Sequence, residues 1–238
     1  LRFLFARYYI FSIFASMKRI LITIVFILLI FSCRNAGESG ISSKNERPTF
    51  SNPIRQRGSS PSIIRHNGKY YYTQSNYVRV SLWCSETIED LKTAEEHVVY
   101  SPENTYYISA PLLRRLDDKW YIYYSSEGKD MSTRQIHVLE NPSDDPLQGS
   151  FTHKAVINTG NMKSIHPHIF ENLGRRYLLW SGYDKAEDSE IDIFRIYIAE
   201  LANPWTLASK PAAILSPKYE WECQWVSNNG LANKSPIY

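Results

Sequence analysis

The 238-residue chain contains 43% apolar, 14% aromatic and 21% charged residues, a composition typical of a globular protein rather than a disordered or fibrous one. Its net charge of +3 arises in residues 1–32, which hold four basic and no acidic residues, so 23 basic and 24 acidic residues remain beyond them. The rest of the chain lacks the basic excess typical of nucleic-acid binding, and we expect no nucleic-acid partner.

The N-terminal segment has the features of a targeting signal. Residues 1–16 are apolar and aromatic, and we expect them to lie upstream of the true start at Met17. Two basic residues follow Met17 and precede the twelve-residue apolar run Ile20–Phe31. Because this run is short for a bilayer core of about 30 Å, residues 17–33 are predicted to be a signal peptide rather than a spanning helix.

The signal ends in Ile30-Phe31-Ser32-Cys33, which resembles a bacterial lipobox. The resemblance implies cleavage before Cys33 and a lipid on its sulfur, and hence a lipoprotein secreted across the inner membrane and held at the periplasm or cell surface. A membrane anchor and a secretory signal with an incidental Cys33 are the alternatives. Residues 34–47 are polar and aperiodic, which predicts a tether, and the globular part is expected over residues 48–238.

The globular part repeats one pattern three times. Each copy opens with a proline, runs through an apolar strand to a short turn, and returns as a strand that begins basic and aromatic. The copies are Pro61–Ser75, Pro111–Ser126 and Pro167–Gly182. This pattern predicts a β-hairpin in each copy. We take Tyr70, Trp120 and Tyr177 as equivalent positions, which makes the repeats 50 and 57 residues long.

Two further strands follow each hairpin: one that alternates apolar and polar residues, and a short apolar run. They are expected at 78–86 and 98–100, at 134–141 and 155–157, and at 194–201 and 212–215. Four strands per repeat are typical of a β-propeller blade. The sequence therefore predicts an all-β propeller with three blades and the beginning of a fourth, and we expect the chain to be part of a longer protein.

Phrases within these repeats resemble one enzyme family. They are NPI at 52–54, HNGKYYYTQS at 66–75, DDKWYIYYSS at 117–126, DPL at 145–147, GRRYLLWSG at 174–182, NPWTL at 203–207 and SPKYEWE at 216–222. Together they resemble glycoside hydrolase family 43, which comprises arabinanases, α-L-arabinofuranosidases and β-xylosidases. The resemblance implies a five-bladed β-propeller, of which about three and a half blades are present. It also implies hydrolysis of O-glycosidic bonds in arabinose- or xylose-containing polysaccharides, and we expect no cofactor.

The family's chemistry is inverting hydrolysis, in which a general base activates water and a general acid protonates the leaving oxygen. The resemblance places the base before the proline of the first hairpin, where this chain has Ser60, and an acid-tuning Asp before that of the third, where it has His166. The second hairpin has Ser109-Ala110-Pro111-Leu112 where the family has Trp-Ala-Pro-Glu. The motif carboxylates of these hairpins are therefore replaced.

The family's general acid is the Glu of an Asn-Glu-Gly-Pro phrase in the fourth blade. Asn228-Asn229-Gly230 would be that phrase with Asn229 in place of Glu, or the phrase lies beyond Tyr238. We favour the second alignment, because Asn228 follows Trp221 closely and Leu231 stands where the proline should be.

The residues at the motif positions have limited chemistry. Ser60 has no paired base, so we expect a small polar residue at a strand start rather than a general base. His166 could act as base, acid or charge partner, and a hydrogen bond to a sugar hydroxyl is the role we expect. With His168 it makes a two-histidine set without a third ligand, so we expect no metal. Cys84 and Cys223 are expected to be buried or incidental rather than a disulfide framework.

Other side chains are assigned by their place in the repeat. We expect sugar contacts from Ser109, Leu112 and His168, and from the aromatic residues outside the repeat, which are Tyr106, Tyr107 and Trp225. The repeat tryptophans Trp83, Trp120, Trp180 and Trp205 are expected in the core. The acidic residues Glu103, Asp117, Asp118, Glu127 and Asp130 are expected to be solvated loop residues, although Glu127 or Asp130 could stand in as the base.

Two functions remain open on the sequence. The first is a glycoside hydrolase with a rearranged site, tethered to the membrane only through its lipid and acting on an oligo- or polysaccharide. The second is a catalytically inactive lipoprotein that binds glycan with the same propeller. A protein-interaction scaffold is a weaker third option, because fold does not fix function.

Overall fold

The structure is a computed structural model and describes residues 52–55, 59–103, 106–127, 134–185, 192–219, 223–228 and 231–236. The chain divides into two compact units, Leu1–Thr49 and Phe50–Tyr238, and every described residue belongs to the second. The predicted signal peptide, Cys33 and the tether therefore lie outside the described residues. Within the described ranges, no helix has the length and apolar character needed to cross a membrane.

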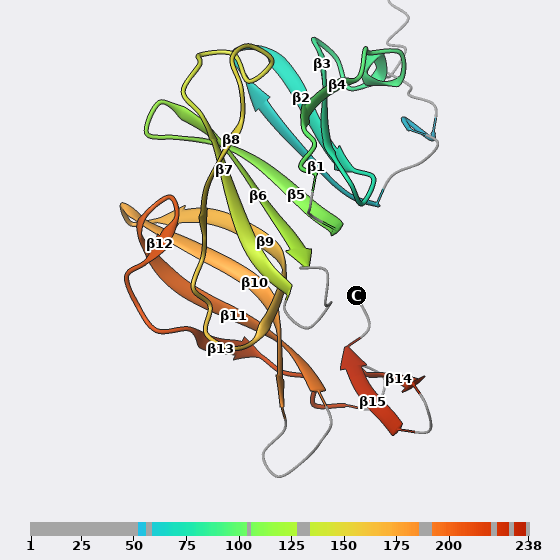
Figure 1. The fold of residues 1–238 in the computed structure, drawn as a ribbon, viewed down its shortest axis with the longest axis vertical. Helices are drawn as coiled ribbons and strands as arrows, with labels where there is room; N and C mark the ends of the chain where they lie inside the picture. Colours follow the sequence, from blue (N-terminus) through green and yellow to red (C-terminus); the bar gives the residue numbers. More distant parts are fainter. Residues whose placement is uncertain are drawn as a thin grey trace, which may run out of the picture. The chain divides into compact units, whose positions relative to one another are not determined.

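Three long hairpins occupy the predicted repeats (Figure 1). They are formed by β1 (Ser59–His66) with β2 (Lys69–Ser75), by β5 (Tyr106–Leu116) with β6 (Lys119–Glu127), and by β9 (Lys163–Asn172) with β10 (Arg175–Lys185). The turns are Asn67-Gly68, Asp117-Asp118 and Leu173-Gly174, and both residues of each turn have positive φ angles. Turns with this backbone match the right-handed twist of the strands, and the predicted hairpins are confirmed.

Each hairpin is extended into an antiparallel sheet by the strands that follow it. The first sheet adds β3 (Val80–Ser85) and β4 (His97–Tyr100), and the second adds β7 (Arg134–Asn141) and β8 (Thr152–Val156). In the third sheet, β11 (Asp192–Asn203) pairs with β10, β12 (Thr206–Leu207) and β13 (Ala212–Leu215). β14 (Cys223–Asn228) and β15 (Leu231–Pro236) form a separate hairpin where the fourth blade is predicted to begin. The short 3-10 helix η1 (Glu89–Lys92) lies between β3 and β4.

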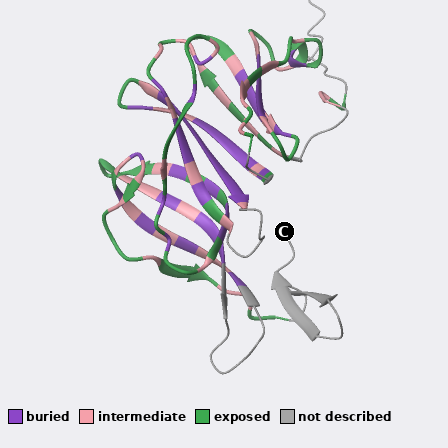
Figure 2. Cartoon of the chain, in the orientation of Figure 1, coloured by how far each residue is buried: buried purple, intermediate pink, exposed green. Residues whose placement is uncertain are grey.

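The core lies between successive sheets. The innermost strands of successive sheets contact each other, β1 with β5 and β5 with β9. Buried residues lie along all three sheets (Figure 2). One core cluster joins the first and second sheets and contains Leu82 and Trp120, and another joins the second and third and contains Tyr123 and Trp180. Sheets that bury their faces only against their neighbours are propeller blades. The all-β propeller fold is thus confirmed, while the total of five blades stays a prediction.

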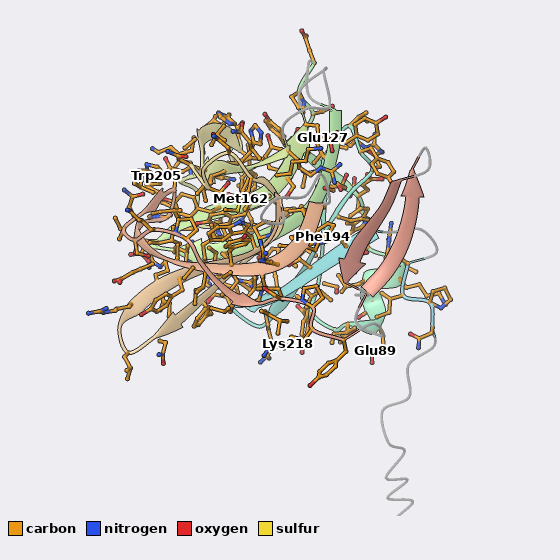
Figure 3. The ribbon with its side chains drawn as sticks, turned by 90° about the horizontal axis from the view of Figure 1, so that it is seen from below. Glu89, Glu127, Met162, Phe194, Trp205 and Lys218 are labelled. Atoms are coloured by element: carbon orange, nitrogen blue, oxygen red, sulfur yellow. The ribbon has the colours of Figure 1, made fainter. Side chains whose placement is uncertain are left out.

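The repeat tryptophans pack largely as predicted. Trp83, Trp120 and Trp180 are at most 4% exposed. Trp205 is only partly buried and packs, with Met162, against the cluster between the second and third sheets (Figure 3). On β3 of the first sheet, Cys84 is partly buried and forms no disulfide.

One equivalence drawn from the sequence is wrong. Tyr70 pairs with Arg65 and Trp120 pairs with Arg115, and the residue at the same register of the third hairpin is Arg176, which pairs with Glu171. The repeats are therefore 50 and 56 residues long. Tyr177 lies one position further along β10, and its side chain points to the opposite face because strand side chains alternate.

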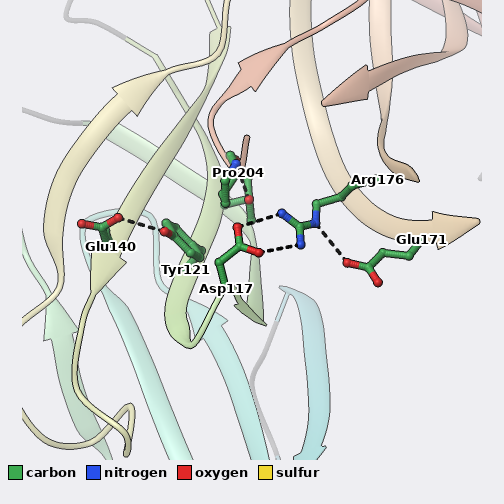
Figure 4. A network of polar contacts seen from close by, with 7 residues as sticks. Asp117, Tyr121, Glu140, Glu171, Arg176 and Pro204 are labelled. Atoms are coloured by element: carbon green, nitrogen blue, oxygen red, sulfur yellow. Dashed lines mark hydrogen bonds and ion pairs between the residues drawn. The ribbon is translucent and has the colours of Figure 1, made fainter. Parts of the chain in front are cut away.

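Arg176 joins the second and third sheets through an ion-pair network (Figure 4). Its guanidinium donates two hydrogen bonds of 3.0 Å to the carboxylate of Asp117, in the turn between β5 and β6, and a third of 3.0 Å to Glu171. These bonds lower the pKa of Asp117. In the same contact region, the Tyr123 hydroxyl donates a 2.6 Å bond to the Pro204 carbonyl. Asp117 is thus a solvent-exposed turn residue, as predicted, and it also makes a contact between sheets that the sequence did not predict.

Candidate functional site

Each of the three sheets has a bulge at the same place on its innermost strand. The pairing register shifts between Ser59 and Ser62 of β1 and between Ser109 and Leu112 of β5. In β9 it shifts between Ile165 and His168, which pair with Ser181 and Leu179 of β10. In each case the innermost strand has one residue more than its partner. The dipeptides Ser60-Pro61, Ala110-Pro111 and His166-Pro167 therefore occupy equivalent places, as the repeated prolines predict.

The residue before each of these prolines has a left-handed backbone. Its φ angle is 48° at Ser60, 51° at Ala110 and 56° at His166. Residues other than glycine rarely adopt this conformation, which costs about 1–3 kcal/mol each. A bulge redirects the side chain it carries. The same strained conformation in three sheets indicates that these positions share a purpose beyond strand pairing.

The three bulges meet at one pocket of about 640 Å³. It is lined by Ser60, Pro61, Ser62 and Ile63 from the first sheet, by Ala110, Pro111, Leu112 and Arg114 from the second, and by His166, Pro167, His168, Ser181 and Ile196 from the third. The pocket is therefore built from one short segment of each innermost strand, with two contributions from β10 and β11. Its polar groups are hydroxyls, two imidazoles and one guanidinium.

The structure brings four of the predicted site residues together at this pocket. They are Ser60, Leu112, His166 and His168. Ser109 is not among the lining residues, and its hydroxyl instead donates a weak hydrogen bond of 3.5 Å to the Ser125 carbonyl. Its assignment to sugar contact is not supported by this placement.

The predicted aromatic contacts are only partly described. Tyr107 lies on β5, three residues before Ala110, and is 42% exposed. The side chains of Tyr106 and Trp225 lie outside the described part of the structure. Asn228 ends β14 and Leu231 begins β15, so Asn229 falls in the link between them, which is also outside it. The choice between the two alignments of the general acid therefore stays a prediction.

The pocket environment favours neutral imidazoles. His166 is open to the pocket, yet the surrounding protein removes part of its hydration, and this desolvation together with the charge of Arg134 lowers its pKa. Desolvation and the nearby Arg114 likewise lower the pKa of His168. Both rings are thus neutral at pH 7, when one nitrogen of each donates a hydrogen bond and the other accepts one.

Two arginines of this site have no counterpart in the sequence-based predictions. Arg114 lines the pocket, and Arg134 begins β7 and acts electrostatically on His166. Arg114 could have been found, because it follows Leu112 by two residues on β5 and residues two apart share one face of a strand. Arg134 could not, because its effect on His166 depends on how the second sheet packs against the third.

Arg134 forms an ion pair with Glu127, at the end of β6. Both side chains are largely buried, at 21% and 11% exposed, and Figure 3 shows Glu127. Oε2 of Glu127 and Nε of Arg134 have no hydrogen-bond partner among the described residues. The expectation that Glu127 is a solvated loop residue is therefore wrong, because β6 extends to include it and Arg134 neutralises it.

The described lining of the pocket contains no Asp or Glu. Asp118 is fully exposed at the far end of the hairpin, Glu103 is exposed, and Asp130 lies outside the described residues. Among the described residues, no group of three or more His, Cys, Asp and Glu is placed to hold a metal. The pocket as described can hydrogen-bond hydroxyl groups, but it holds no carboxylate pair for inverting hydrolysis.

Comparison with known proteins identifies the family. The family model described as "Glycosyl hydrolases family 43" matches residues 50–232, which include every strand that forms the pocket. The chain belongs to glycoside hydrolase family 43. Within this family, the chain is 34% identical over 194 residues to an extracellular exo-α-(1→5)-L-arabinofuranosidase of Streptomyces chartreusis, which covers 77% of this chain and 58% of that protein.

Further relatives agree with this assignment. The chain is 30% identical over 220 residues to α-L-arabinofuranosidase B of Pyricularia oryzae, covering 87% of this chain and 45% of that protein. The crystal structure of an α-L-arabinofuranosidase from Lactobacillus brevis matches with 28% identity and a TM-score of 0.67, over 73% of this chain and 58% of that one. The chain thus spans 58% or less of the length of these family 43 relatives.

Proposed function

We propose that this protein is a glycoside hydrolase that acts on arabinose-containing glycans. The observation that carries this proposal is the convergence of three equivalent bulges, at the family's motif positions, on one pocket. The relatives support the choice of sugar, since those at 30–34% identity are named arabinofuranosidases. The xylose-containing substrates that the family also includes are the competing choice.

The lining residues suit a neutral sugar. Ser60, Ser62 and Ser181 offer hydroxyls, and His166 and His168 each offer a donor and an acceptor when neutral. Pro61, Ile63 and Leu112 supply apolar surface for the carbon-bound hydrogens of a sugar ring. A pocket of this kind binds through a few placed polar groups in an apolar wall, which is how small-molecule sites achieve orientation. We propose that His166 makes a hydrogen bond with a sugar hydroxyl.

Hydrolysis needs a carboxylate base that Ser60 does not provide, and we propose that Glu127, which does not itself line the pocket, takes that role through a bridging water. Its carboxylate is buried at the same end of the second sheet as Ala110, since β6 residue Ser125 pairs with Ser109. Its Oε2 is free of hydrogen bonds within the described residues. Its partner Arg134 also acts on His166, so Glu127, Arg134 and His166 form one electrostatic group.

The substitution Glu127→Gln tests this role. It should lower kcat at least about 100-fold with little change in KM. An unchanged kcat would mean that another residue is the base.

The proposed function is tested by an activity panel. The protein is assayed with 4-nitrophenyl α-L-arabinofuranoside, 4-nitrophenyl β-D-xyloside and linear arabinan, with product anomers followed by NMR. We expect arabinose release with inversion from the arabinosides and little from the xyloside. Binding of arabinan without release of any sugar would overturn the proposal in favour of the inactive glycan-binding protein.

We also propose that the protein is a lipoprotein attached through Cys33. This proposal rests on the basic residues, the short apolar run and the lipobox-like ending of the signal, with the polar residues 34–47 as a spacer. Attachment at the periplasm or cell surface would bring the pocket to polysaccharide outside the cytoplasm.

A further inference from the structure

Two exposed tyrosines lie together at an edge shared by the first and second sheets. Tyr77 is 58% exposed and Tyr107 is 42% exposed. Their ring centroids are 6.3 Å apart and the ring planes are inclined by 76°, so one ring presents its edge to the face of the other. Large aromatic side chains are usually buried where packing allows it. We call this solvent-exposed pair, Tyr77 and Tyr107, the aromatic corner.

The backbone holds both tyrosines in an unfavourable conformation. Their φ angles are 72° at Tyr77 and 54° at Tyr107, in the left-handed region that bulky residues rarely enter. Strain of this kind persists only where the surroundings enforce it, and it is concentrated at functional positions. Nothing in strand pairing requires a tyrosine at either position, since glycine or asparagine would relieve the strain.

Hydrogen bonds fix the corner in place. The Ile108 amide donates a 2.8 Å bond to the Tyr77 carbonyl, which ties the second sheet to the first. The buried Ser75 hydroxyl donates a 2.8 Å bond to the Ile108 carbonyl. On the other side of Tyr77, the Asn76 side-chain oxygen accepts from the Arg79 amide at 3.2 Å. The two rings are therefore presented by a rigid support rather than by a loose loop.

The corner lies beside the pocket. Ser75 pairs with Ser59, the neighbour of Ser60, and Tyr77 follows Ser75 by two residues. Tyr107 precedes Ala110 by three residues, a separation of about 10 Å along a strand. Both tyrosines thus lie at the same end of their sheets as the bulges that form the pocket. A ligand longer than one sugar unit that leaves the pocket toward this end of the sheets would pass over this surface.

From this placement we propose that Tyr77 and Tyr107 form a second sugar subsite, which stacks on the glycan unit next to the one held in the pocket. The inference rests on the proposed function for the class of glycan. Tyrosine faces pack well against the carbon-bound hydrogens of sugar rings, while tyrosine hydroxyls remain available to hydroxyl groups of the sugar. Neutral, partly apolar rings beside a pocket of hydroxyls and neutral imidazoles favour an uncharged oligosaccharide over a charged peptide or a lipid headgroup.

The test separates the subsite from the pocket by ligand length. Affinity is measured by calorimetry for methyl α-L-arabinofuranoside, which fills one unit, and for a thio-linked α-1,5-arabinotetraose, whose linkages resist hydrolysis. We expect Tyr77→Ala and Tyr107→Ala each to weaken tetraose binding about 3- to 10-fold and to leave binding of the monosaccharide glycoside unchanged. Tyr77→Phe and Tyr107→Phe keep the ring and should bind within about twofold of the original protein. Leu173→Ala, at the far turn of the third hairpin, is the control for loss of an exposed apolar side chain.

Unchanged tetraose affinity in both alanine variants overturns the subsite. So does an equal loss for the two ligands, because that pattern means damage to the pocket itself, and so does absence of tetraose binding by the original protein. Hydrolysis of 4-nitrophenyl α-L-arabinofuranoside decides the proposed function separately. If the protein binds the tetraose through the tyrosines but hydrolyses no substrate, the subsite proposal stands and the proposed glycosidase activity is overturned.

Discussion

At the pocket, Ser60 and His166 stand where the family resemblance places carboxylates, and neither side chain is negative at neutral pH. The left-handed backbone at both positions is nevertheless kept, so a carboxylate placed there would be directed as the native side chain is. We expect Ser60→Asp combined with His166→Asp to raise kcat on aryl arabinofuranosides at least about tenfold. Ser62→Asp adds a charge to the same pocket outside the bulge position and is the matched control. If the rate stays at background, the two carboxylates are not sufficient, and other features of the pocket must also differ from those of an active enzyme.

The electrostatic link between Arg134 and His166 can be tested without any activity. Arg134→Gln removes a positive charge that, together with desolvation, holds the pKa of His166 below its ordinary value of 6.5. We therefore expect this pKa to rise toward 6.5 in the variant, as followed by NMR titration of the imidazole protons. The pKa of His168 should stay where it is, because its charge partner is Arg114. A shift of both histidines would indicate a general change of the pocket instead.

At the scale of elements, the hairpin turns differ in how well their residues suit the backbone. Leu173 has a φ angle of 49° and is 93% exposed, so its side chain gains nothing from packing there. Asn67, with φ of 47° in the equivalent turn, suits this conformation better. We expect Leu173→Asn to stabilise the protein and Asn67→Leu to destabilise it, each by about 0.5–1 kcal/mol in urea unfolding. If both substitutions changed the free energy of unfolding in the same direction, the shared turn type would be contradicted.

The ion pair between Asp117 and Arg176 joins two sheets and should make their association depend on pH. Because its hydrogen bonds to Arg176 lower the pKa of Asp117 below the ordinary 3.8, the pair stabilises the fold above that value. This contribution is lost as the pH falls through the lower pKa of the folded state. We expect Asp117→Asn to lower the thermal midpoint at pH 7 and to differ little from the original protein near pH 2. Because Asp117 is partly exposed, the loss at pH 7 should be about 1 kcal/mol at most.

For the whole molecule, the proposed attachment to the membrane depends on a single atom, the sulfur of Cys33. Expressed in a bacterium with lipoprotein processing, the original protein should sediment with membranes and incorporate labelled palmitate. Cys33→Ala should abolish the label and release the protein from the membrane fraction, while arabinoside hydrolysis by the released protein continues. Retention of the variant in membranes would show that the apolar run is an uncleaved anchor.

The sequence alone was enough for the fold class and the order of the strands, while individual boundaries differ by a few residues, as for 155–157 against β8 (Thr152–Val156). Alternating side chains, two-residue turns and the recurrence of one pattern are local properties, and hydrogen bonding between adjacent strands converts them directly into hairpins and blades. The repeated prolines also predicted which segments meet at the axis, because equivalent positions of successive blades face the same centre. The one error of register, Tyr177 for Arg176, arose because an aromatic residue was matched by type rather than by its distance from the turn.

Only the tertiary structure decided the charged neighbours of the site and the contacts between sheets. Arg134 reaches His166 because two sheets pack together, Glu127 is buried because β6 continues to it, and Asp117 bridges sheets because Arg176 faces it across their interface. The corner of Tyr77 and Tyr107 depends on a backbone contact between a loop of one sheet and a strand of the next. Such contacts join residues far apart in the chain, and their geometry is fixed by blade packing, which no local pattern of residues encodes.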